Sequence, residues 1–170
     1  LLADAGAEII KVERPGRGDP RRSMPPFAEK EGNRKAAGFM SYNRNKKSLA
    51  LNLQHLEGQK IFHELATTSD VVVENLRPGA MDKIGLNYSN LSSSHTRLIW
   101  AIISGFGQLK GYRGPYSDRP AFDIVAEAMS GIMHQVGYAD KPPSDTLYGM
   151  ADIYTGMVTA FGIMQALFMR

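Results

Sequence analysis

Short apolar runs along the chain alternate with segments whose apolar residues are spaced as on a helix. The runs rich in β-branched side chains predict strands. They are residues 8–13, 48–53, 70–74 and 97–104. Residues 55–67 instead predict an amphipathic helix, whose apolar stripe consists of Leu56, Ile61, Phe62 and Leu65. Strands and helices in this order favour right-handed βαβ units. The pattern therefore predicts an α/β fold, with a Rossmann-like doubly wound parallel sheet and flanking helices.

Turn residues and apolar spacing assign the remaining segments. A polar, proline-rich loop is predicted for residues 14–38, and a loop of this length in a compact domain is usually functional or mobile. The other predictions are an extended segment at 39–42, a helix at 78–85, a helix or turn at 88–94, a glycine-rich loop at 105–119, a helix at 120–136 and a last helix from 152 onward.

Three predicted strands end at candidate ligand-binding positions. In a doubly wound sheet, ligands bind outside the carboxyl ends of the strands. These ends are Glu13-Arg14, Glu74-Asn75 and Ser104-Gly105. Each leads into a turn that contains glycine or proline, where backbone amides can approach a ligand closely.

Composition narrows the possible classes of protein. The 170 residues suffice for one domain with a full core, and 43% hydrophobic residues are ordinary for a globular protein. These residues include no cysteine, which excludes disulfides, thiolate metal sites and cysteine nucleophiles. The net charge of +3 is too small to predict a nucleic-acid partner.

Positive charge is concentrated near the N-terminus. More than half of the 20 lysines and arginines lie in the first 47 residues. This distribution indicates either a solvated face or a site for an anion such as a phosphate-bearing cofactor.

Sequence motifs exclude several chemistries and leave one. The histidines are scattered without a ligand pair at helical spacing, so no metal is predicted. Neither a P-loop nor a Gly-x-Ser-x-Gly elbow occurs. What remains is carboxylate chemistry beside a basic, glycine-rich anion site, because an ionised aspartate can attack an activated acyl or phosphoryl group.

Asp152 is the candidate carboxylate. It opens a stretch to Arg170 that is otherwise almost free of charge. One interpretation is that Asp152 only caps the last helix, and the other is that it is a positioned nucleophile. Residues 149–169 approach the ~20 residues that span a bilayer. Asp152 and Gln165 within this stretch favour a buried core helix, so no membrane partner is predicted.

The N-terminal residues 1–6 are typical of a helix end closed by Gly6. They lack the basic and apolar regions of a signal peptide, and a cytoplasmic location is expected. Because the chain lacks an initiator methionine, we also expect it to be a fragment.

Six segments together resemble the class III CoA-transferases, which include formyl-CoA, carnitine and bile-acid CoA-transferases and the related α-methylacyl-CoA racemases. The matching segments are residues 1–16, 43–48, 73–80, 103–108, 119–123 and 151–156. They occur in family order and are distributed along nearly the whole chain. The resemblance implies an enzyme that moves CoA from an acyl-CoA donor to a small carboxylic acid, with no metal.

The resemblance also implies roles for individual residues. Asp152 stands at the family's catalytic aspartate, which forms a mixed anhydride and then an aspartyl-CoA thioester. The positions implied to bind CoA are Arg14, Asn75, Leu76, Ala80, Lys83 and Arg119. Lys83 replaces a frequent arginine and loses its bidentate fork. Alternatives remain for three of these residues: Arg14 as an ion-pair partner, Asn75 as a helix cap, and Lys83 as a charge at a helix end.

Departures from the family pattern sharpen the hypothesis. The racemases carry an acid/base histidine where this chain has Phe122, which cannot move a proton and so favours a transferase. The alternatives are a racemase or a non-catalytic CoA-binding fragment.

Residues 1–170 are expected to form a single CoA-binding and catalytic portion of the large domain, without its first strand and the C-terminal half. The resemblance implies an interlaced homodimer for the full-length protein.

Overall fold

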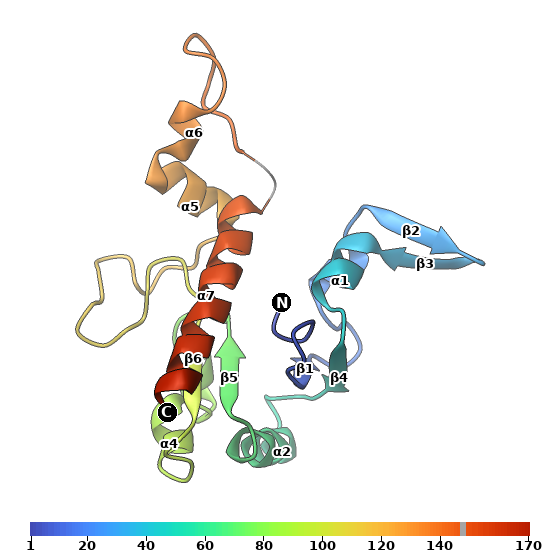
Figure 1. The fold of residues 1–170 in the computed structure, drawn as a ribbon, viewed down its shortest axis with the longest axis vertical. Helices are drawn as coiled ribbons and strands as arrows, with labels where there is room; N and C mark the ends of the chain where they lie inside the picture. The colour runs from blue at the N-terminus through green and yellow to red at the C-terminus, as the bar shows by residue number, and fades with distance from the viewer. Residues whose placement is uncertain (147–148) are drawn as a thin grey trace. The chain divides into compact units, whose positions relative to one another are not determined.

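The computed structural model describes residues 1–146 and 149–170 and divides the chain into two compact units. The first unit runs from Leu1 to Phe62 and the second from His63 to Arg170. Figure 1 labels most elements of both units, and each unit is described by itself.

A parallel strand pair forms the centre of the first unit. Strand β1 (Ile9–Glu13) pairs with β4 (Lys46–Ala50), with Ile9 opposite Lys46 and Glu13 opposite Ala50. The prediction for β1 is confirmed. Strand β4 ends earlier than predicted because the Asn52 side chain accepts the Gln54 amide at 3.0 Å and begins a turn.

The predicted loop at 14–38 contains secondary structure. It holds a short 3-10 helix, η1 (Pro20–Ser23), and an antiparallel hairpin of β2 (Phe27–Lys30) and β3 (Asn33–Ala36). Glu31 and Gly32 turn the hairpin with φ of 53° and 75°, as in a two-residue hairpin turn with both residues left-handed. Glu-Gly is not the usual Asn-Gly or Asp-Gly signal, so the pattern did not reveal it.

The prediction of an extended segment at 39–42 is wrong. These residues belong to helix α1 (Ala37–Tyr42), which packs against η1 and β3. The Arg22 guanidinium lies 3.8 Å from the centre of the Phe39 ring. This tertiary contact supports a helical turn that six residues alone would not sustain.

Helix α2 (Leu56–Thr67) confirms the predicted helix. Phe62 and Ala66 are buried, whereas Leu56 at one end of the predicted stripe is 71% exposed. The helix begins tightly against the preceding turn, because a Cβ on Gly58 would lie 2.1 Å from the Asn52 carbonyl oxygen.

The second unit is built on another parallel pair. Strand β5 (Val71–Glu74) pairs with β6 (Ile99–Ile102), and α3 (Ala80–Lys83) and α4 (Tyr88–Ser92) lie between them in the chain. All four elements fall within predicted segments. The apolar core of this part includes Met81, Leu86, Leu91 and Leu98.

The helix predicted for 120–136 is two helices. Helix α5 (Asp123–Ser130) ends at Gly131, whose φ of 80° is left-handed, and α6 (Ile132–Gln135) follows. Glycine adopts this conformation without a steric penalty, which explains the break.

The last helix, α7 (Met150–Met169), packs against α5 and β6 (Figure 1). The prediction of a buried core helix is wrong for this chain, since Ile163 is the buried residue of α7 and Phe161 is 64% exposed. Two neighbouring elements cannot cover a helix that is apolar on every side. Within the described residues, no helix is long and apolar enough to cross a membrane.

The two parallel pairs and the helices between their strands confirm the α/β class. The hairpin β2–β3 is an antiparallel addition in the first unit.

Candidate functional site

A cavity of about 240 Å³ lies at the carboxyl ends of β5 and β6. Because these strands are parallel, the turns that follow them meet at one edge of the pair. The cavity is lined by Asn75, Leu76, Arg77, Pro78, Ile103, Ser104, Gly105, Arg119, Pro120, Ala121, Phe122 and Val125. Its walls are thus the turn after each strand and the start of α5, as the strand-end argument predicts.

Gly105 allows two walls of this cavity to approach. A Cβ added at Gly105 would lie 2.3 Å from the Cβ of Ala121, far inside van der Waals contact. The turn after β6 can therefore touch the segment before α5 only with glycine at this position.

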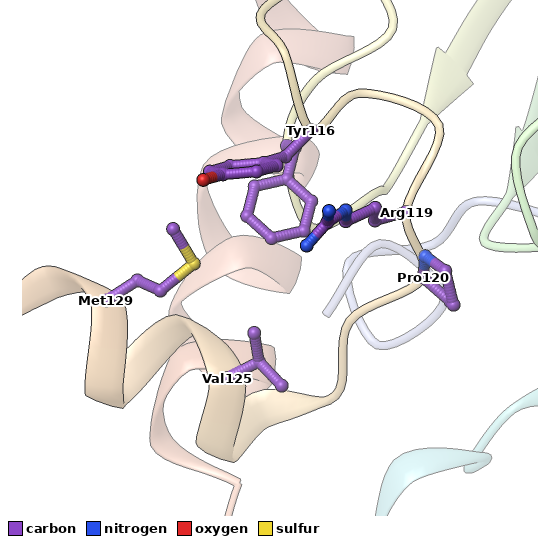
Figure 2. Close-up of a pocket in the computed structure, with 6 residues that line it drawn as sticks. Tyr116, Arg119, Pro120, Val125 and Met129 are labelled. Carbon is purple, nitrogen blue, oxygen red and sulfur yellow. The ribbon is translucent and has the colours of Figure 1, made fainter.

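A second cavity, of about 300 Å³, shares Arg119, Pro120 and Val125 with the first. Val125 and Met129 project from α5 toward it, and the Arg119 guanidinium stacks 4.6 Å from the centre of the Tyr116 ring (Figure 2). Arg119 thus brings a fixed positive charge to a largely apolar wall, which suits a ligand with both apolar and anionic parts.

Three of the predicted CoA-binding residues line the first cavity: Asn75, Leu76 and Arg119. Ala80 and Lys83 lie in α3, directly after this turn, and line neither cavity. Asn75 is not a helix cap, because α3 begins at Ala80 with Gly79 as its N-cap. Lys83 is the last residue of α3, where its charge opposes the negative end of the helix dipole.

Glu74, the last residue of β5, lies at one of the predicted strand ends but was assigned no role in binding or catalysis. Its Oε2 accepts the Leu76 amide at 2.8 Å and so shapes the turn that lines the cavity. Burial raises the pKa of Glu74, and the Leu76 amide partly offsets this effect. The signal in the sequence is a carboxylate that ends an otherwise apolar strand.

Asp152 is the third residue of α7 and is exposed. The N-cap is Gly149, so the last helix begins two residues before the predicted start and Asp152 lies inside its first turn. The carboxylate of Asp123 accepts the Gly149 amide at 3.2 Å and the Asp152 amide at 3.0 Å. Asp152 itself lines neither cavity. Its partner Asp123 directly follows Phe122, which lines the first cavity.

Asp123 ends the family-like segment 119–123, and no role was predicted for it. Its partners lie 26 and 29 residues away in the chain, a separation at which no local pattern indicates a hydrogen bond.

Arg14 belongs to the other unit and follows β1 as an exposed residue. In the ranges that the structure describes, the ion pair at this turn is made by Arg22 instead, whose guanidinium binds the Glu13 carboxylate through two contacts of 2.8 Å. Arg22 lowers the pKa of Glu13 to about 2.

Several cations near the N-terminus have carboxylate partners within their own unit. The pairs are Lys11–Asp19, Arg22–Glu13, Arg44–Asp4 and Lys47–Glu8. Part of the positive charge that suggested an anion site therefore stabilises the turns of the first unit.

The fold and the cavity define an α/β protein with a candidate ligand cavity at the carboxyl ends of parallel strands. The family sequence model of CoA-transferase family III matches residues 1–170, and the chain belongs to this family.

Two curated relatives and one crystal structure illustrate the similarity. The chain is 43% identical over 170 residues to succinyl-CoA:glutarate CoA-transferase of Mus musculus, covering 99% of this chain and 37% of the relative. It is 41% identical over 172 residues to succinyl-CoA:mesaconate CoA-transferase of Haloarcula marismortui, covering 100% and 43%. A CAIB/BAIF family protein from Brucella suis aligns with a TM-score of 0.90 at 40% identity, covering 99% and 44%. The chain thus spans less than half the length of these relatives.

Proposed function

We propose that the protein containing this chain transfers CoA from an acyl-CoA donor to a small carboxylic acid. Membership of CoA-transferase family III supports this function, as do relatives named for the same reaction type. Because two of these relatives are named for succinyl-CoA together with a dicarboxylic acid, we propose a dicarboxylic acid as the acceptor.

The reaction would run through Asp152 as a covalent nucleophile. Its carboxylate attacks the thioester carbonyl of the donor, the C–S bond breaks, and CoA leaves as a thiolate to give a mixed anhydride. The thiolate then attacks the aspartyl carbonyl, which releases the donor acid and leaves an aspartyl-CoA thioester.

The second half of the reaction reverses these steps with the acceptor. The acceptor carboxylate attacks the aspartyl thioester, and the released thiolate attacks the acyl group of the new anhydride. The products are the acceptor's CoA thioester and the Asp152 carboxylate, so neither a proton carrier nor a redox partner is consumed.

The observation that carries the proposal is the contact between the first residue of α5, next to a cavity-lining residue, and the start of α7. Asp123, beside the cavity-lining Phe122, binds the Asp152 amide at 3.0 Å. We propose that a CoA thioester bound in the cavity brings its acyl group to the first turn of α7, where the positive end of the helix dipole favours an anionic nucleophile.

The predicted CoA-binding residues keep their roles in this proposal. Asn75, Leu76 and Arg119 line the cavity, and Ala80 and Lys83 follow the same turn in α3 and are proposed to bind the phosphates. Arg14 of the first unit is proposed as a further contact with the nucleotide. The single catalytic portion, the homodimer and the cytoplasmic location stay predictions.

A racemase is the alternative, and Phe122 is the residue that speaks against it. Phe122 is 83% exposed and lines the cavity, and its ring can neither accept nor donate a proton. A racemase would need another acid/base group at this wall.

Trapping with hydroxylamine tests the proposal in the protein as its gene encodes it. Incubation with succinyl-CoA and hydroxylamine is expected to convert Asp152 into its hydroxamate, located by peptide mass. Asp152→Asn should abolish both labelling and transfer, whereas the matched variant Asp140→Asn, in an exposed loop, should retain both.

Other outcomes would identify the alternatives. Transfer by a protein whose Asp152 is never labelled would contradict the covalent mechanism. Exchange of the α-proton of an acyl-CoA in deuterated water, without transfer, would identify a racemase. Saturable CoA binding with neither reaction would identify a binding module.

A further inference from the structure

Helix α5 carries two carboxylates one helical turn apart that both bind the segment leading into α7. Asp123 and Glu127 are four residues apart, so they lie on the same face of α5. Asp123 binds the start of α7, and Glu127 binds Thr146, before that start. The segment that carries Asp152 is therefore held at two points by one helix.

The contact made by Asp123 uses both of its carboxylate oxygens. Oδ2 accepts the Gly149 amide at 3.2 Å, and Oδ1 accepts the Asp152 amide at 3.0 Å. Gly149 is the N-cap and Asp152 is the third residue of α7. In a capping box, an acidic residue at this third position would accept the amide of the N-cap residue. Here Asp123 accepts that amide, so the capping role that local sequence suggests for Asp152 is performed from another helix.

The contact made by Glu127 is buried. Glu127 is 2% exposed, its Oε2 accepts the Thr146 amide at 2.9 Å, and its Oε1 accepts the Thr146 hydroxyl at 2.6 Å. A buried carboxylate is costly unless hydrogen bonds satisfy it. Thr146 supplies two such bonds, one with its backbone and one with its side chain, which makes this a specific anchor for the chain before α7.

We propose that Asp123 and Glu127 are positioning residues that fix the first turn of α7 and thereby the direction of the Asp152 carboxylate. This inference rests on the proposed function, since it assigns Asp152 the nucleophilic role. Neither carboxylate needs to touch the substrate. Asp123 holds the backbone of Asp152 itself, and Glu127 holds Thr146.

Substitution of Asp123 separates positioning from binding. Asn has the same shape but offers one carbonyl oxygen where the two amides need two acceptors. Asp123→Asn is expected to lower kcat and the rate of hydroxamate formation about tenfold to a hundredfold, because small misplacements of a reacting group have effects of this size. The KM for succinyl-CoA should change by less than about twofold, since the cavity walls remain.

Thr146 provides a matched pair of variants at the second anchor. Thr146→Val removes the hydroxyl that Glu127 accepts, and Thr146→Ser keeps it. The valine variant is expected to lower kcat with little change in KM, and the serine variant to restore it to within about twofold of the wild type. A surface control is Glu57→Gln on α2, whose carboxylate pairs with Lys60 in the solvent.

The outcomes decide the inference in each case. Wild-type rates of labelling in both Asp123→Asn and Thr146→Val would overturn it, as would a rise in KM without a fall in kcat. If the wild-type protein forms no hydroxamate, the proposed function fails. Amide hydrogen exchange then tests by itself whether Asp123 holds the first turn of α7. Faster exchange at Gly149 and Asp152 in Asp123→Asn would support it, and unchanged exchange would overturn it.

Discussion

The first strand of each parallel pair ends in a glutamate, and the two glutamates have opposite electrostatic surroundings. Glu13 is the last residue of β1, and Glu74 is the last residue of β5. Arg22 holds the pKa of Glu13 at about 2, whereas burial raises the pKa of Glu74. One strand end is therefore closed by an ion pair, and the other carries a carboxylate for which the described residues form no salt bridge.

This difference separates a structural turn from a candidate site. The Glu13 carboxylate binds Arg22, the Asp19 amide and Ser48. An ion pair and two hydrogen bonds therefore fix the turn that follows β1. The Glu74 carboxylate binds only the nearby Leu76 amide among the hydrogen bonds of the described ranges, and the turn after β5 borders a cavity. An ion pair thus stabilises the turn at one strand end, whereas a cavity borders the turn at the equivalent end of the other pair.

A substitution that disturbs the walls of the cavity after β5 and β6 is expected to have the largest effect. In Gly105→Ala the new Cβ would lie 2.3 Å from that of Ala121, so the two walls must separate. We expect a loss of stability of about 1–3 kcal/mol and at least about tenfold weaker CoA binding by calorimetry, because the walls that would hold CoA are displaced. A tenfold change corresponds to about 1.4 kcal/mol. Gly114→Ala, in open space in the same loop, is the control and should bind normally. Unchanged affinity in Gly105→Ala would show that this cavity does not bind CoA.

Removal of each strand-end carboxylate tests the comparison directly. Glu13→Gln should lower the free energy of unfolding by about 1–3 kcal/mol, because the buried Glu13 side chain loses the charge that binds the exposed Arg22 guanidinium. Glu74→Gln should change it by less than about 0.5 kcal/mol, since no cation is left behind. Urea unfolding of both variants measures the difference. Equal losses would mean that the two strand ends are not electrostatically distinct.

Acidification should reveal the same contrast as a pH profile. Because the folded pKa of Glu13 is lowered from 4.5 to about 2, its contribution is present above pH 4.5 and is lost as the pH falls from 4.5 to about 2. For Glu74 the folded pKa is raised, so stability falls as the pH rises from 4.5 through that higher value. Urea midpoints from pH 2 to 7 should therefore fall less steeply on the acid side in Glu13→Gln. A profile identical to that of the wild type would contradict this.

The smallest expected effect concerns the cation that lines the cavity after β5 and β6. Arg119→Lys keeps the charge but loses the planar stacking on Tyr116, which should weaken CoA binding about twofold to fivefold. Arg113→Lys in the same loop lines neither cavity and should bind as the wild type does. If both variants bind equally, Arg119 does not contact the ligand through its guanidinium.

Most of the strands and the edge that carries the site could be predicted. The β-branched runs at β1, β5 and β6 and the glycine and proline that follow them act locally, so their pattern predicts both strands and turns. The hairpin β2–β3 and helix α1 escaped prediction because a Glu-Gly turn and the contact of Arg22 with Phe39 support them. The break at Gly131 escaped because glycine inside a helical pattern does not by itself show whether the helix stops.

The amino-acid sequence by itself determined the α/β alternation, the family motifs and the position of Asp152 at the start of an apolar helix. These features depend on neighbours a few residues away, and local spacing records them. The tertiary structure alone decided which carboxylate binds the start of α7, which strand end is closed by an ion pair, and where a cavity remains. Each of these depends on a contact between distant segments: Asp123 with Asp152 across 29 residues, Glu13 with Ser48 across 35, and Gly105 beside Ala121. Burial and distance set the energies of such contacts, and both exist only once the chain has folded.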